Sequence, residues 1–182
     1  MFRLLDLLLS SLGLCLSLPF LAVIYVIGLF DSGSPLFFQE RIGQNKKKFI
    51  LVKYRTMSID TASVASHLAS SSSITPFGHF LRKTKVDELP QLWNVLKGEM
   101  SLVGPRPGLF NQQELIDERD ALGVFTVLPG ITGLAQVSGV DMSTPKLLAQ
   151  TDAKMIAIFS LKNYFKYILR TIIGGGSGDR IK

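Results

Sequence analysis

The stretch RKTKVDELPQLWNVLKGEMSLVGPRP, residues 82–107, predicts a helix that carries an acidic pair at its beginning. Its leucines recur at i, i+3 and i+7, the spacing of one helical face: Leu89, Leu92 and Leu96. Gly98 is a natural helix stop, and Pro90 is tolerated only in the first turn of a helix. We therefore expect Asp87 at the cap of this helix and Glu88 in its first turn.

Basic residues flank the acidic pair in the sequence: Arg82, Lys83, Lys85 and Arg106. The positive end of a helix dipole and nearby cations both favour the ionised form of an aspartate. An ionised carboxylate can attack phosphorus as a nucleophile, or share a Mg²⁺ ion with substrate phosphates. The alternative is a helix cap beside a surface acid in a salt-bridge cluster, and the acidic pair taken alone favours this alternative.

An apolar run from Leu4 to Phe30 precedes this region and contains one charged residue, Asp6. A helix of about 20 apolar residues is enough to cross a bilayer. A cleaved signal peptide is disfavoured because the run is too long and no small-residue cleavage site follows it. A buried core helix fits poorly because the run has no polar face. We therefore expect this segment to insert into a membrane.

The same run either spans the membrane or re-enters on one side. Pro19 lies in the middle of the run and kinks a helix, while the hydroxyl of Ser17 can satisfy a freed backbone group. Arg3 precedes the run and more basic residues follow it: Arg41, Lys46, Lys47 and Lys48. Two basic flanks allow both ends to face the cytosol. A simple span with a harmless proline remains the alternative.

The chain of 182 residues has a net charge of +6, which favours anionic partners. Its single cysteine, Cys15, excludes a disulfide framework and a cysteine-based zinc site. A nucleic-acid-binding module is disfavoured because no binding motif is present and the acidic pair would repel phosphate. A membrane segment, a basic domain and an acidic pair among cations together indicate a phosphorylated substrate at a membrane surface.

Elsewhere the sequence predicts short local elements. Residues 48–54 read as a strand, with Lys53 near its end, and Thr75 caps a helix that begins at Pro76. Residues 101–108 and 129–139 read as glycine-containing loops. The last helical segment, residues 151–173, has a basic face, and both a membrane-surface helix and an ordinary core helix fit that pattern.

Three segments, residues 39–57, 74–107 and 128–139, resemble the bacterial sugar transferases, the monotopic polyprenol-phosphate phosphoglycosyl transferases. The chain length is similar to that of the minimal catalytic form of this family. The resemblance implies an α+β fold: a small, mainly helical, membrane-associated domain with a short β element and an N-terminal re-entrant membrane helix.

The resemblance also implies a domain organisation. Residues 1–30 would form a helix-break-helix in the membrane, with the break at Pro19. Ser17 stands two residues before that proline, whereas the family often has serine directly before it. Residues 31–173 would form the cytosolic catalytic domain with amphipathic interfacial helices, and residues 174–182 a flexible tail.

The implied activity is transfer of a phospho-sugar from a UDP-sugar to undecaprenyl phosphate, with release of UMP. This is the first membrane step of surface glycan synthesis (O-antigen, capsule, exopolysaccharide or glycoprotein glycan) at the cytosolic face of the bacterial inner membrane. Asp87 would form a phosphosugar-aspartyl intermediate and ligate Mg²⁺, and Glu88 would assist as a base or metal-site partner. Lys53, Arg82 and Arg106 match positions expected to contact phosphates.

The sugar, the glycan pathway and the oligomeric state are left open by the sequence. Many family members carry arginine and asparagine where Val140 and Asp141 follow the glycine-rich segment, a region expected to help select the nucleotide sugar. A non-catalytic membrane scaffold of a glycan assembly complex is the alternative function, because it would keep the fold without requiring an ionised Asp87.

Overall fold

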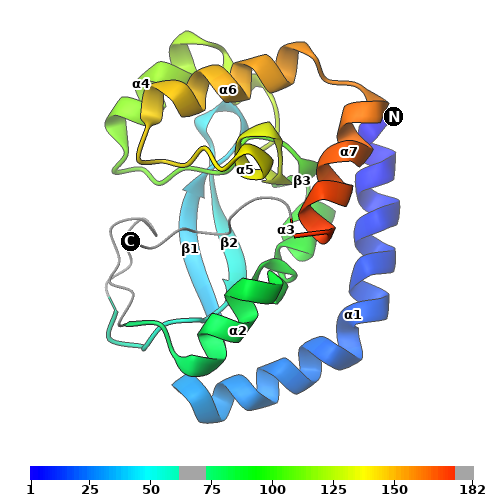
Figure 1. Ribbon diagram of the computed structural model, residues 1–182, viewed down its shortest axis with the longest axis vertical. Helices are drawn as coiled ribbons and strands as arrows, with labels where there is room; N and C mark the ends of the chain where they lie inside the picture. The colour runs from blue at the N-terminus through cyan, green and yellow to red at the C-terminus, as the bar shows by residue number, and fades with distance from the viewer. Residues whose placement is uncertain (62–72, 175–182) are drawn as a thin grey trace.

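The computed structural model describes residues 1–61 and 73–174 and packs helices around two small sheets (Figure 1). The helices are α1 (Phe2–Ser32), α2 (Pro76–Thr84), α3 (Gln91–Lys97), α4 (Gln113–Ala121), α5 (Leu134–Ser138), α6 (Pro145–Ala157) and α7 (Leu161–Ile172). The strands are β1 (Leu36–Ile42), β2 (Lys48–Tyr54), β3 (Ser101–Val103) and β4 (Gly130–Thr132). Short 3-10 turns are η1 (Gln44–Lys46), η4 (Val86–Glu88) and η5 (Val124–Thr126). This confirms the α+β class; the predicted tail lies outside the described residues from 175 onward.

The apolar N-terminal run forms α1, a helix of 31 residues with Pro19 inside it. Within the described residues, α1 is long and apolar enough to cross a membrane. In Figure 1 the first part of its ribbon runs beside α7, and its last part turns to run below α2. The helix ends at Gly33, whose positive φ of 72° suits a residue without a side chain. The segment that the sequence predicts to enter a membrane is therefore the same segment that forms this long apolar helix.

Polar side chains fasten the N-terminal end of α1 to the rest of the protein. Arg3 Nη2 donates to the carbonyl of Val95 at 2.7 Å, near the C-terminal end of α3. Asp6 is 2% exposed and its Oδ1 accepts from the Leu102 amide at 3.0 Å and from Tyr164 Oη at 2.8 Å. Burial, followed by the bond to Asp6, raises the pKa of the Tyr164 phenol. The charged side chains near the start of α1 are thus hydrogen-bonded to other parts of the protein.

The second half of α1 packs on the other end of the domain. Leu21 and Ile24 form a buried cluster with Tyr54 and Leu81, and the Tyr54 hydroxyl donates to the Leu21 carbonyl at 2.6 Å. Ser17 Oγ donates at 3.4 Å to the carbonyl of Leu14. Pro19 has no amide hydrogen, so the carbonyl that loses its helical partner is that of Cys15. Ser17 therefore bonds to the neighbouring carbonyl and not to the one that Pro19 frees.

The predicted strand at residues 48–54 is confirmed as β2, and it pairs antiparallel with β1 from Leu36↔Tyr54 to Ile42↔Lys48. The sequence analysis did not identify β1. Asn94 of α3 bonds to the backbone of β2. Its side chain accepts from the Val52 amide at 3.1 Å and donates to the Ile50 carbonyl at 2.7 Å. These bonds hold α3 against β2.

The loop predictions for residues 101–108 and 129–139 are wrong in part, because each segment contains a strand and the second also contains α5. β3 and β4 pair in parallel, with Ser101 opposite Gly130 and Val103 opposite Thr132. A Cβ atom on Gly130 would lie 2.0 Å from the amide nitrogen of Gly104, so only glycine allows this approach. The glycines therefore allow the backbones of β3 and β4 to approach closely. In the sequence, the same glycines cannot be told from those of an ordinary turn.

The single helix predicted for residues 151–173 is also wrong, because the structure has α6 and α7 with a break at residues 158–160. Ser160 caps α7 by accepting the Asn163 amide at 3.3 Å. Tyr164 and Tyr167 of α7 are buried, whereas Leu169 and Ile172 are exposed. The predicted Thr75 cap of α2 is confirmed, since its hydroxyl accepts the Gly78 amide at 2.9 Å.

Candidate active site

The acidic pair lies in η4, the 3-10 turn between α2 and α3. The prediction that Asp87 caps a helix is wrong, because α3 begins only at Gln91. Pro90 has no amide hydrogen and cannot donate to the Val86 carbonyl, which instead accepts from the Leu89 amide at 3.1 Å. The proline therefore separates the acidic pair from the helix that follows. The predicted stop at Gly98 is confirmed, with a φ of 86°.

Asp87 is 7% exposed, which is a low value for an aspartate. Its turn packs against β2 and follows α2 directly. Val86 and Leu89, on either side of the pair, pack against the cluster that contains Leu21 and Ile24 of α1. The structure thus places the acidic pair near the second half of α1.

Glu88 meets Arg106 across the site. Its Oε1 accepts from Arg106 Nη2 at 3.2 Å and from Nη1 at 3.3 Å. The Glu88 and Arg106 side chains are 14% and 23% exposed, so the pair is shielded but not sealed. The structure therefore brings together two predicted site residues that lie 18 positions apart in the chain.

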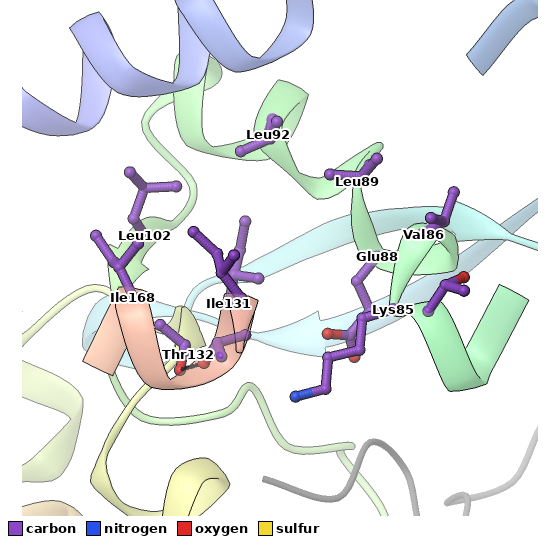
Figure 2. A pocket seen from close by; sticks show the side chains of 12 residues that line it. Lys85, Val86, Glu88, Leu89, Leu92, Leu102, Ile131, Thr132 and Ile168 are labelled. Carbon is purple, nitrogen blue, oxygen red and sulfur yellow. Dashed lines mark hydrogen bonds between the residues drawn. The ribbon is translucent and has the colours of Figure 1, made fainter. Parts of the chain in front are cut away.

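Lys85 is a site residue that the sequence prediction did not select. It ends α2 in a left-handed conformation, with φ 58° and ψ 17°, and lines the same cavity as Glu88 (Figure 2). Burial lowers the pKa of the Lys85 ammonium, Arg106 lowers it further, and Glu88 opposes the shift. Its place among several basic residues in the sequence gave no signal that it would differ from its neighbours.

The predicted phosphate contacts Lys53 and Arg82 lie on the two elements that adjoin η4. Lys53, on β2, is buried, and its ammonium lies 5.6 Å from the centre of the Phe37 ring. Arg82, on α2, donates through Nε to the Thr56 hydroxyl at 2.8 Å. Its Nη1 is buried and has no hydrogen-bond partner within the described residues. Their role toward phosphate stays a prediction.

A buried ion pair supports the loop that carries Arg106. Arg119 Nη1 donates to the Arg106 carbonyl at 2.8 Å, and Arg119 Nη2 and Nε donate to Asp152 Oδ2 at 2.7 and 3.0 Å. Arg119 is 2% exposed and Asp152 is fully buried. The sequence analysis missed both residues, because an arginine and an aspartate 33 positions apart give no local signal.

Carboxylates for a metal ion are few at this site. Across residues 1–61 and 73–174 no three side chains of His, Cys, Asp or Glu gather into a metal-binding cluster. Mg²⁺ is usually held by one or two carboxylates together with substrate phosphates and water, so it does not need such a cluster. The adjacent carboxylates of Asp87 and Glu88 therefore fit Mg²⁺ that arrives with a diphosphate.

The comparison with protein families matches the chain to the model described as bacterial sugar transferase, over residues 1–175. The chain belongs to the bacterial sugar transferase family. The match covers α1, both sheets and the η4 turn, so the acidic pair of this sugar transferase lies within the part of the chain that matches the family.

Named relatives of this sugar transferase share about a third of its residues over the aligned region. The UDP-galactose-lipid carrier transferase of Erwinia amylovora is 37% identical over 86% of this chain and 36% of its own length. The UDP-glucose:undecaprenyl-phosphate glucose-1-phosphate transferase of Caulobacter vibrioides is 37% identical over 93% of this chain and 67% of its own length. The undecaprenyl-phosphate galactose phosphotransferase of Salmonella typhimurium is 35% identical over 78% of this chain and 34% of its own length.

This sugar transferase spans only part of several of these relatives. The alignment covers 36% of the Erwinia protein and 34% of the Salmonella protein. Those relatives contain further sequence that the alignment does not cover, so the names describe longer proteins.

Proposed function

We propose that this sugar transferase moves a phospho-sugar from a UDP-sugar to undecaprenyl phosphate and releases UMP. The observation that carries the proposal is the shielded Asp87–Glu88 pair, which has Arg106 and Lys85 beside it and α1 behind it. The names of the Caulobacter and Salmonella relatives supply the acceptor class, and the Erwinia and Caulobacter names supply the nucleotide class. The sugar itself is left open.

In the first step, a carboxylate oxygen of Asp87 attacks the sugar-bearing phosphorus. The bond from that phosphorus to the bridging oxygen breaks, and UMP departs with the electron pair. In the second step, a phosphate oxygen of the acceptor attacks the same phosphorus, the bond to Asp87 breaks, and the carboxylate is regenerated. The product is a polyprenyl-diphosphate sugar.

The cations of the site suit this chemistry, because phosphoryl transfer depends mainly on positioning and on neutralising charge. Arg106 is held by Glu88 on one side and by Arg119 through its backbone carbonyl on the other. Glu88 keeps the Arg106 fork oriented toward the turn that carries Asp87. Mg²⁺, when bound with the donor, would neutralise the diphosphate, and Asp87 and Glu88 are the side chains that would hold it.

We also propose that α1 re-enters the membrane and that the domain lies on the cytosolic face. Both ends of α1 bond to one domain: Arg3 contacts the Val95 carbonyl, and Asp31 Oδ2 accepts from the Thr75 hydroxyl at 2.7 Å. A straight spanning helix would put its ends on opposite sides of about 30 Å of hydrocarbon. Contacts at both ends therefore support a helix that bends at Pro19.

Labelling tests this topology. Single cysteines are placed at residues 2 and 33 in a background that lacks Cys15, and intact cells are treated with an impermeant maleimide. A re-entrant helix predicts protection of both positions from the outside. Labelling of one position would establish a span and overturn the re-entrant proposal.

The activity test uses purified protein with Mg²⁺ and a panel of UDP-sugars, with and without undecaprenyl phosphate. The proposal predicts UMP release, and it predicts a phosphosugar mass on the peptide that contains Asp87 when the acceptor is omitted. Asp87→Asn should show neither. A protein that folds but yields no UMP and no adduct with any donor would favour the scaffold alternative.

A further inference from the structure

A groove of about 290 Å³ is lined by Glu88 of the acidic pair and lies between η4 and α3 on one side and β3, β4 and α7 on the other (Figure 2). We call it the apolar groove, and its lining is mostly aliphatic: Val86, Leu89, Leu92, Leu102, Ile131, Ile168 and Ile172, with Thr84, Lys85, Glu88, Thr132 and Thr171. Several of these side chains pack on the buried core behind them, so the walls are braced.

The polar groups of the apolar groove are not distributed evenly. Lys85 and Glu88 come from η4 and the residue before it, and Figure 2 shows both side chains projecting from that one segment. On the opposite wall, Thr132 and Thr171 bond to each other through their hydroxyls at 2.5 Å and so satisfy one another. The groove therefore has a cationic and acidic end and a long apolar wall.

One lining residue of the apolar groove packs against α1. Leu92 lines the groove, and its Cδ1 lies 3.2 Å from the position of a Cβ atom built on Gly13 of α1. This contact places one wall of the groove next to the candidate membrane helix, which favours a lipid as its ligand.

We propose that the apolar groove holds the phosphate end of the acceptor lipid: Lys85 binds the phosphate and the aliphatic wall holds the first isoprene units. This inference rests on the proposed function and adds the place and the recognising residue for the acceptor. A volume of about 290 Å³ accommodates roughly ten groups of the size of a water molecule or a methylene. Two isoprene units contain ten carbon atoms, so the groove holds both units only when the phosphate lies at its rim, beside Lys85.

The donor is a poorer occupant of the same groove. A sugar nucleotide is covered with hydroxyl, amide and phosphate groups, and burying them against aliphatic side chains without hydrogen bonds is unfavourable. A prenyl chain has no such requirement. The charge of Lys85 is matched by one anionic phosphate at the end of an apolar chain, which is the chemistry of the acceptor.

The first experiment separates the two half-reactions. With a UDP-sugar alone, Lys85→Gln should lower the rate of adduct formation and UMP release by a much smaller factor than it lowers discharge of the adduct to the acceptor. When undecaprenyl phosphate is added, the acceptor concentration for half-maximal discharge should rise about tenfold or more, because a charged hydrogen bond is lost. Lys85→Arg keeps the charge and should restore most of the affinity.

The matched control is Lys83→Gln, which removes an exposed charge of α2 that does not line the groove. It should leave acceptor dependence unchanged at constant ionic strength. A Lys85→Gln protein with normal acceptor dependence would overturn the assignment. So would a Lys85→Gln protein that loses adduct formation as strongly as it loses discharge, because Lys85 would then serve the donor.

The second experiment tests the apolar wall. Ile168→Trp should obstruct the apolar groove, whereas Leu169→Trp places the same side chain on an exposed position of α7 outside it. Discharge of the adduct by geranyl phosphate, which has two isoprene units, should slow at least tenfold in Ile168→Trp and little in Leu169→Trp. Adduct formation reports whether each variant folds.

Comparison of geranyl phosphate with inorganic phosphate tests how much of the acceptor recognition comes from the apolar wall. The proposal predicts that geranyl phosphate discharges the adduct at far lower concentration than inorganic phosphate, and that the difference shrinks in Ile168→Trp. Equal efficiency of inorganic and geranyl phosphate would overturn the wall assignment. Absence of any adduct in the unaltered protein would instead overturn the proposed function, and this inference with it.

Discussion

Two arginine–carboxylate pairs lie close together in this protein, and they differ in what surrounds them. Glu88–Arg106 is shielded but partly open, next to a groove. Arg119–Asp152 is sealed, with 2% and 0% exposure, and its arginine also holds the Arg106 carbonyl. The first pair can exchange partners with a ligand. The second holds the backbone of the first in place.

Under the proposed function, the open pair serves substrate binding and the sealed pair serves positioning. A sealed pair cannot reach substrate, but removal of one partner leaves an uncompensated charge in the core. A partly open pair contributes less to stability, since solvent screens it. We therefore expect substitutions at the two pairs to separate activity from stability.

The largest expected effect is on activity at the open site. Asp87→Asn removes the proposed nucleophile, and loss of a nucleophile typically lowers turnover by about 10⁴-fold or more. The thermal unfolding midpoint should change little because asparagine has nearly the same shape. UMP release and calorimetry measure the two quantities, and near-normal turnover in this variant would contradict the assignment.

At the sealed pair, the effect should appear in stability. Arg119→Met leaves Asp152 buried without its partner and should lower the free energy of unfolding by about 3–5 kcal/mol. Arg119→Met combined with Asp152→Leu should recover much of this loss, because both charges are then absent. Denaturant titration in a fixed detergent gives both values. A loss below about 1 kcal/mol in the single variant would contradict the positioning role.

Glu88→Gln should affect turnover more than stability. It keeps the shape but removes the charge that orients Arg106, and we expect turnover to fall about 10- to 100-fold, the range for loss of an oriented acid or base. Because the Glu88–Arg106 pair is partly open to solvent, the free energy of unfolding of Glu88→Gln should lie within about 1 kcal/mol of the unaltered protein. A large destabilisation here would show that the open pair is structural after all.

The pH dependence of acceptor binding should identify Lys85. Burial lowers the pKa of the Lys85 ammonium. As pH rises through this lowered pKa, affinity for the acceptor should fall by up to about tenfold, at a lower pH than an ordinary lysine would require. Folding has the opposite sign: the unfolded chain keeps this proton longer, so stability rises with pH between the lowered pKa and 10.5. Lys85→Arg should abolish the alkaline loss, and its persistence would assign that loss elsewhere.

The smallest effect should come from an exposed pair. Lys46 Nζ lies 2.6 Å from Asp120 Oδ2, and the two side chains are 48% and 53% exposed. Lys46→Gln should change the free energy of unfolding by less than about 1 kcal/mol. A larger loss, measured by the same denaturant titration, would show that exposure does not separate the pairs as argued.

The features that the sequence predicted correctly are those that depend on neighbouring residues. The apolar run became α1, residues 48–54 became β2, Thr75 capped α2, and Gly98 ended α3. Each rests on propensity, on a missing side chain or on a local hydrogen bond, which a few adjacent residues determine. Pro90 misled the same reasoning, because its missing donor produced a 3-10 turn before α3 instead of a first helical turn.

Contacts between distant residues were decided by the tertiary structure. The parallel pairing of β3 with β4, the approach of Arg106 to Glu88 and the support of Arg119 by Asp152 join segments 18 to 33 positions apart. The bonds of Asp6 to Leu102 and Tyr164 join segments still further apart. The sequence shows which residues are charged. Which of them form pairs, and how exposed each pair is to water, depends on how distant segments pack in the folded core.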